Sequence, residues 1–299
     1  MLLSAFIVGF ESVAIEGALN IAKLDLFLVS SVPTIIGGLI LMSIYPRRTV
    51  AFCRELGKRG WLFMFALCSI AAVGIILWFD AVGRIGAGKE AILGGGSSEV
   101  LFVVVLSAIF LSERLRLLEA IGSLLVILGV FVVLANTETM NLTLGLGEAE
   151  AILSSLCLGT SVVMTTILIK NRDLTPFSGI ELLLSGIIVI TASVLGGLIT
   201  VPDLTGLLIV FLLGLFPAMG LLTYNAGLPK IGASLTSVLF ALNGIMTVGV
   251  QLLVLGVFPG ANITLPQSVA LAVSGGVVAF IGVYLLEKGD SSKNAHQGQ

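Results

Sequence analysis

The chain has 299 residues, of which 57% are hydrophobic and 11% charged, with a net charge of −2 and a mean hydropathy of +1.16. This composition excludes an ordinary soluble globular domain. The only histidine is His296, and the three cysteines (Cys53, Cys68 and Cys157) lack the spacing of a metal or redox motif. We therefore expect neither a zinc site nor a disulfide framework.

Ten long apolar runs follow one another along the chain, joined by short connections. A helix needs about 20 apolar residues to cross roughly 30 Å of hydrocarbon. We predict spans at 2–22, 27–45, 61–81, 88–111, 117–135, 149–170, 177–200, 205–224, 231–257 and 267–286. The first run has no basic segment before it and contains two glutamates, so we interpret it as a retained helix and not as a signal peptide.

The fifth and tenth runs show the best internal match. Gly122 and Gly129 align with Gly275 and Gly282, and the second glycine of each pair is followed by valine. The junctions FDAVGRIGAG and YNAGLPKIGAS also align if one residue is inserted. One five-helix unit is thus predicted to occur twice.

These observations predict an all-α integral membrane protein with ten transmembrane helices in two five-helix repeats. The repeats cover 2–135 and 148–286, and 287–299 form a polar cytoplasmic tail. Because each unit has an odd number of spans, the second enters the membrane from the opposite face. Inverted repeats of this kind are common in secondary transporters.

The basic residues set the predicted orientation in the cell membrane. On the ten-span map, 12 of the 15 basic residues lie on one side. Only Lys23, Arg84 and Lys89 lie on the other. The positive-inside rule makes the first side cytoplasmic, with both termini there. The arginine-rich connection 46–60 is expected to be a loop that anchors the protein on this side.

Carboxylates inside the predicted spans are the next signal, because an ionised side chain near the membrane centre costs several kcal/mol, about 2.5 or more. Glu11 lies halfway along the first span and Glu99 halfway along the fourth. Glu16 is five residues from Glu11, about 140° around the helix, and lies nearer the outer end. We favour Glu11 by its depth. Each midplane carboxyl either binds solute and exchanges protons or forms a neutral hydrogen bond to a neighbouring helix.

The stretch ILGGGSS precedes Glu99 and includes Ser97 and Ser98. Three consecutive glycines weaken a helix, and broken helices at membrane depth occur where protein or water covers them. The stretch is either a partly unwound segment that contacts substrate or a face of small residues that another helix approaches closely.

Charged residues also gather at the predicted outer ends of the third and fourth spans. They are Asp80, Arg84, Lys89 and Glu90. They form either a mouth that attracts a charged solute or, as we favour, a solvated ion-pair cluster. Trp78 is expected in the aromatic belt or lining the outer cavity.

In the second half, the polar candidates inside spans are Thr160, Asn243 and Gln251. Hydroxyl side chains often bond to their own helix, so Thr160 carries less information. The two amides are costlier to bury and are therefore stronger candidates for substrate binding.

The segment EVLFVVVLSAIFLSERL, from Glu99, and the following GSLLVILGV resemble the EamA repeat of the drug/metabolite transporter (DMT) superfamily. The carboxylate of Glu99 and the pair Glu113 and Arg114 carry this resemblance. The chain departs from the family at Val100, where proline is frequent, and the second unit lacks the Glu-Arg pair. Alignment of the junctions places Ile245 opposite Glu99. The resemblance implies a central cavity between two units and transport of small polar solutes, often outward.

We therefore expect a secondary transporter or facilitator of small polar metabolites, such as amino acids or related amines, working by alternating access and with proton coupling left open. A lipid or lipid-linked-sugar translocator of the same fold and a non-transporting scaffold are the alternatives. An intramembrane enzyme lacks support, since no histidine lies in a span and no aspartate-rich motif is present. We expect no cofactor, no metal and no nucleic-acid partner. The native unit is either a monomer or a homodimer.

Overall fold

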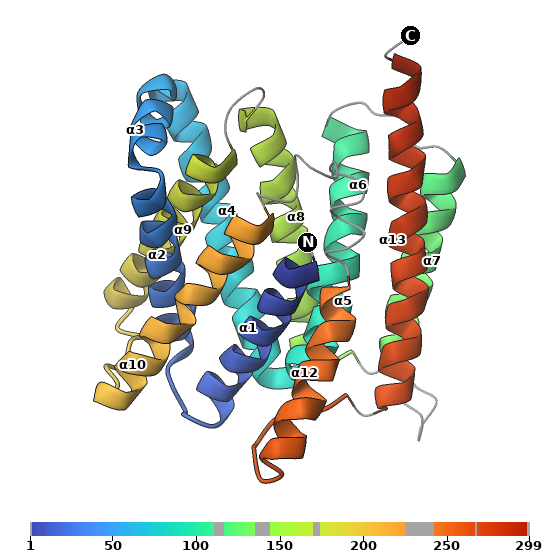
Figure 1. Ribbon diagram of the computed structural model, residues 1–299. Helices are drawn as coiled ribbons and strands as arrows, with labels where there is room; N and C mark the ends of the chain where they lie inside the picture. Colours follow the sequence, from blue (N-terminus) through green and yellow to red (C-terminus); the bar gives the residue numbers. More distant parts are fainter. Residues whose placement is uncertain are drawn as a thin grey trace.

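The computed structural model describes residues 2–110, 117–134, 144–169, 174–224, 242–266 and 268–297, and the regular structure among them is helical (Figure 1). Six helices are long and apolar enough to cross a membrane. These are α1 (Leu2–Asn20), α2 (Leu26–Ile44), α4 (Gly57–Ile85), α8 (Leu146–Ile169), α9 (Leu174–Leu195) and the stretch Leu204–Tyr224, which begins with α10 (Leu204–Leu213). The protein is therefore a multi-pass membrane protein.

The remaining predicted spans hold helices whose described apolar stretches are shorter. They are α5 (Ala87–Leu93), the π-helical turn η1 (Gly94–Ser98), α6 (Glu99–Phe110), α7 (Leu117–Leu134), α12 (Asn243–Val257) and α13 (Val269–Gln297). Most of the first half of the predicted ninth span lies outside the described residues, and so does the Glu113–Arg114 pair. The predicted polar tail continues α13 as a helix to Gln297.

The segment expected to be a loop between α2 and α4 is instead a helix, α3 (Pro46–Glu55). Proline at its first position suits a helix start, because the missing N–H has no partner there in any case. Thr49, Phe52 and Leu56 are buried, a three- and four-residue spacing that forms one helix face. The ring of Phe52 packs edge-on against Phe177 of α9, with centroids 6.2 Å apart. The loop prediction was wrong because it weighed charge and overlooked this periodicity.

Helices of the first half pack mainly against helices of the second. The most extensive contacts are α7 with α13, α4 with α8 and α2 with α9. Two of these pairs stand side by side in Figure 1: α2 beside α9, and α7 beside α13. The counterpart of α1 is α8, the first helix of the second half, and the counterpart of α6 is α12, since both belong to the fourth span of their half. Exchanging counterparts turns the α1–α12 contact into the α8–α6 contact, which is also observed. The packing therefore follows a pseudo-two-fold relation.

Close glycine contacts show that counterpart helices run in opposite directions. A methyl group on Gly129 of α7 would lie 2.6 Å from the carbonyl oxygen of Gly275 in α13. A methyl group on Gly282 of α13 would lie 2.7 Å from the carbonyl oxygen of Gly122 in α7. The residue numbers rise along α7 as they fall along α13, so the two helices are antiparallel. Small residues let the backbones approach this closely in lipid.

Two further hydrogen bonds obey the same relation. Ser4 Oγ of α1 donates to the carbonyl oxygen of Gly220 at 2.8 Å. Ser154 Oγ of α8 donates to the carbonyl oxygen of Gly74 in α4 at 2.9 Å. Each bond links the first helix of one half to the third span of the other. Ser4 and Ser154 are therefore equivalent residues.

Candidate functional site

Glu99 and Asn243 occupy equivalent positions in the two halves. Gly9 of α1 lies against Asn243 and Thr247 of α12. Gly159 of α8 lies against the carbonyl oxygen of Glu99 and against the side chains of Phe102 and Val103, one turn further along α6. Gly9 and Gly159 are separated by the same interval as Ser4 and Ser154. These contacts make Asn243 the counterpart of Glu99, two residues before Ile245, the residue that alignment of the junctions selects.

Asn243 is 3% exposed and begins α12. Its Oδ1 atom accepts a hydrogen bond from Thr247 Oγ1 at 3.1 Å. On the other side, a methyl group on Gly95 would lie 3.9 Å from Asn243 Nδ2, so the amide faces the π-helical turn. An amide in this position can both donate and accept hydrogen bonds.

The glycine-rich turn before Glu99 widens but stays helical. Residues 94–98 form η1, and the N–H of Glu99 donates to the carbonyl of Gly94, five residues earlier. The stretch is therefore a widened helical turn, and contact with substrate there stays a prediction. Single π turns inside α-helices occur frequently at functional sites. Ser98 is buried beside Glu99, whereas the side chain of Ser97 is not described.

The carboxylates near the bundle centre occupy different surroundings. Glu11 is buried on α1, two residues after Gly9 and so on the side of α1 turned away from α12. Its counterpart by the same interval is Ser161, which is also buried. Glu99 is half-buried and interacts electrostatically with Glu90 towards the outer end and with Glu181 of α9.

Glu16, which the sequence argument ranked below Glu11, has the richest set of partners. It is fully buried, and its Oε2 accepts hydrogen bonds from the N–H of Ala87 at 3.0 Å and from Gln251 Nε2 at 2.7 Å. Its Oε1 accepts a short hydrogen bond from the N–H of Thr264. One carboxylate thus joins α1, the start of α5, α12 and the connection that follows α12.

A polar stripe on α12 could have revealed this network. Asn243, Thr247 and Gln251 recur every four residues and therefore lie on one helix face. Gly9 and Glu16, seven residues apart, share the opposing face of α1. Asn243 and Gln251, the first and last residues of the stripe, are among the predicted site residues. Thr247 and the match of the stripe to α1 were overlooked.

The charged cluster at the predicted outer ends of the third and fourth spans is only partly solvated, in contrast to our expectation. The carboxylate of Glu90 is buried and accepts a hydrogen bond from Trp78 Nε1 at 2.8 Å. Trp78, predicted in the aromatic belt or lining the outer cavity, thus donates a hydrogen bond to a buried carboxylate. Lys89 forms a salt bridge with Glu148 of α8, and both side chains are about nine-tenths buried. The residues are buried because α8, from the second half, covers them.

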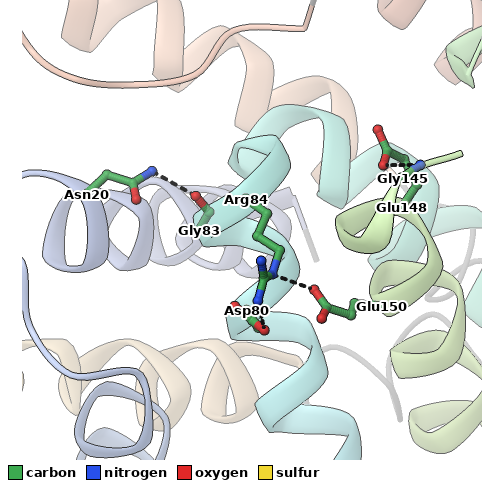
Figure 2. Close-up of polar contacts among 7 residues, drawn as sticks. All are labelled: Asn20, Asp80, Gly83, Arg84, Gly145, Glu148 and Glu150. Atoms are coloured by element: carbon green, nitrogen blue, oxygen red, sulfur yellow. Dashed lines mark hydrogen bonds and ion pairs between the residues drawn. The ribbon is translucent and has the colours of Figure 1, made fainter. Parts of the chain in front are cut away.

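Figure 2 shows the more exposed part of this cluster, where Arg84 reaches two carboxylates. Its Nη2 atom lies 3.0 Å from Asp80 on the same helix, and its Nε atom lies 3.1 Å from Glu150 of α8. Asn20 Nδ2 donates to the carbonyl of Gly83 at 3.1 Å and ties α1 to the same end of α4. The Arg84–Glu150 and Lys89–Glu148 contacts therefore link the two halves at this end, while Asn20 ties two helices of the first half together.

The three candidates of the second half differ in whether they bond within their own helix or contact another helix. Thr160 Oγ1 donates to the carbonyl of Leu156 in its own helix at 2.7 Å, which is the local bond expected of a structural hydroxyl. Gln251 joins the Glu16 network, and Asn243 joins the central turn near Glu99. In the part of the chain that the structure describes, no group of three His, Cys, Asp or Glu side chains could hold a metal ion.

Comparisons with known proteins agree with this architecture. The EamA-like transporter family matches residues 1–135 and 145–288. A solved structure titled "Crystal structure of protein" is similar over 93% of this chain and 96% of its own, with 20% identity and a TM-score of 0.58. No match was found among the curated proteins. Because the family matches nearly the whole chain in two repeats, this protein belongs to the EamA-like transporter family of the DMT superfamily.

Proposed function

We propose that the protein is a secondary transporter, an exporter or facilitator, of small polar metabolites such as amino acids or related amines. The observation that carries this proposal is that the Asn243 amide faces the π-helical turn η1, which Glu99 directly follows. Polar side chains at membrane depth are costly and mark solute or ion paths by default. Family membership supports transport; the choice of solute comes from these side chains.

The chemistry of the centre favours a solute with an amino group. Glu11 and Glu99 supply two carboxyl groups within the spans, and no basic residue accompanies them at the corresponding positions of α8 and α12. A cationic amine would neutralise such a carboxylate, while the Asn243 amide could bind a carboxylate or hydroxyl of the same solute. Exchange of that cation for a proton on a carboxyl group would couple transport to the proton gradient.

The proposed topology has ten spans in two inverted repeats. The protein lies in the cell membrane, with both termini in the cytoplasm. The 12-to-3 distribution of basic residues and the antiparallel counterpart helices support it. In this frame, the Glu16 network and the Lys89–Glu148 salt bridge close the outer end. Alternating access then requires these contacts to break while the two halves rock around the centre.

The test is flux through proteoliposomes containing the purified protein, with a panel of amino acids and amines and an imposed pH gradient. Glu99→Gln is expected to reduce flux of the preferred amine at least tenfold and to remove its dependence on the gradient. The matched control is Glu55→Gln, which removes an exposed carboxylate on α3 and should leave flux unchanged. Unchanged flux and pH dependence in Glu99→Gln would exclude Glu99 from the mechanism.

A further inference from the structure

A band of positive charge follows α3 and the start of α4. Among residues 46–60, five are basic and one, Glu55, is acidic. The basic residues are Arg47, Arg48, Arg54, Lys58 and Arg59, and all of them are exposed. The guanidinium of Arg48 lies over the ring of Tyr45, 5.4 Å from its centroid.

The bundle holds this band in one orientation. Phe52 and Leu56 are buried in the core cluster that includes Phe177 of α9, so one face of the segment is fixed to the protein. Arg47 and Arg54 are seven residues apart, two helical turns, and project from the opposite face. The cations are therefore presented outward by a docked helix and not by a free loop.

Lipid-facing side chains bracket the band at both ends. Leu62 is 73% exposed and Phe65 57% exposed, and they follow Arg59 by about 5 and 9 Å along α4 at 1.5 Å per residue. At the other end, Ile44 is 46% exposed and lies three residues before Arg47. Exposed apolar residues of a membrane protein contact hydrocarbon, so the cations lie at the level of the phospholipid headgroups.

We propose that α3 and the start of α4 bind the headgroups of anionic phospholipids and so anchor this end of the bundle to a negatively charged membrane surface. Each basic residue near such a surface contributes about 1 kcal/mol. Long arginine and lysine side chains can reach the phosphates while their stems cover apolar surface. This assignment does not depend on the transported solute.

Trp61 offers a local probe, because it is 37% exposed and lies two residues after Arg59. The parent protein is full-length and carries only Trp78→Phe, so that Trp61 is its single tryptophan. It would be placed in phosphatidylcholine bilayers, and quenching of its fluorescence by brominated phosphatidylglycerol would be compared with quenching by brominated phosphatidylcholine. We expect the relative association constant to favour phosphatidylglycerol about fivefold, the factor that corresponds to about 1 kcal/mol. Salt at about 0.5 M should reduce this preference, since it shortens the Debye length to a few ångströms.

The variant R47Q/R54Q/K58Q/R59Q should lose the preference, whereas the charge-conserving R47K/R54K/K58R/R59K should keep it. K23Q/K288Q removes exposed basic residues elsewhere and should also keep it. If the fourfold variant does not fold, R47Q/R54Q should lose about half of the preference. Equal quenching by both lipids in the parent protein would overturn the proposal, as would a preference that survives in the fourfold variant. Competition by millimolar inorganic phosphate would also overturn it, because it would indicate a site for free anions.

Discussion

At the positions that the pseudo-two-fold exchanges, the first repeat carries Glu11 and Glu99 where the second carries Ser161 and Asn243. Both repeats nevertheless make the same helix contacts, including the paired serine bonds to Gly220 and Gly74 and the matched glycine contacts of α7 and α13. The carboxylates are therefore not required for this packing. This comparison favours a functional role for Glu11 and Glu99 over a role in joining helices.

The largest expected effect concerns Glu16, a carboxylate whose counterpart is the exposed Thr166. Glu16→Leu would leave the buried N–H of Ala87 and one N–H of the buried Gln251 amide without their acceptor, at roughly 1–3 kcal/mol each. We expect a loss of about 3 kcal/mol or more in the free energy of unfolding, measured by denaturant titration in detergent micelles. Thr166→Ala is the control and should change it by less than about 0.5 kcal/mol. Similar values for the two variants would show that the outer network adds no stability.

The next effect tests whether Glu99 and Asn243 are equivalent. Asn243→Asp in the Glu99→Asn background moves the carboxylate to the other repeat. We expect Glu99→Asn alone to lower flux of the preferred amine by tenfold to a hundredfold, about 1.4–2.8 kcal/mol in transition-state terms, and the double variant to recover part of it. Flux in proteoliposomes is the measurement. Recovery with aspartate placed at Ile245 instead would contradict the assignment of Asn243 as the counterpart.

A smaller effect tests the antiparallel contact of α7 with α13. Gly129→Ala would place a methyl group 2.6 Å from the Gly275 carbonyl oxygen and 2.6 Å from the N atom of Ala279. Overpacking of this kind costs about 1–3 kcal/mol, which we expect as a lower thermal midpoint in micelles. Gly249→Ala in α12 is the matched control, since no atom of the described residues lies within 4 Å of the added methyl group. A control that is destabilised as much as Gly129→Ala would refute the proposed close contact.

The smallest effect compares the two-fold-related serine bonds. Ser4→Ala and Ser154→Ala should each reduce the free energy of unfolding by about 0.6 kcal/mol, typical of hydrogen bonds within membrane bundles. Equal losses in the two variants are the decisive result, because the two bonds have nearly the same donor–acceptor distance, 2.8 and 2.9 Å. Ser43→Ala is the control, since Ser43 is exposed and bonds only within its own helix. A large difference between Ser4→Ala and Ser154→Ala would indicate that the halves are energetically unlike at this position.

The sequence argument located helices well because hydrophobic periodicity is a local property. It placed α1, α2 and α7 within about two residues of their observed ends, within the ordinary uncertainty of helix boundaries. It overlooked α3, where the buried face consists of Thr49, Phe52 and the following Leu56 and the charges dominate. It also ranked Glu16 below Glu11, because depth along a helix was known and the residues facing it were not.

The sequence by itself determined that this is a membrane protein built from two related repeats and that it belongs with the EamA-like transporters. Those conclusions rest on hydropathy, glycine placement and a motif, all of which can be read one segment at a time. Only the tertiary structure decided that Asn243 is the counterpart of Glu99 and that Glu16 joins α1 to α5 and α12. The rotation and register of a helix are set by contacts between residues far apart in the chain. A carboxylate 235 residues away in sequence can therefore become the partner of Gln251. The polar stripe on α12 indicates that a partner exists, but only the helix contact shows that this partner is Glu16.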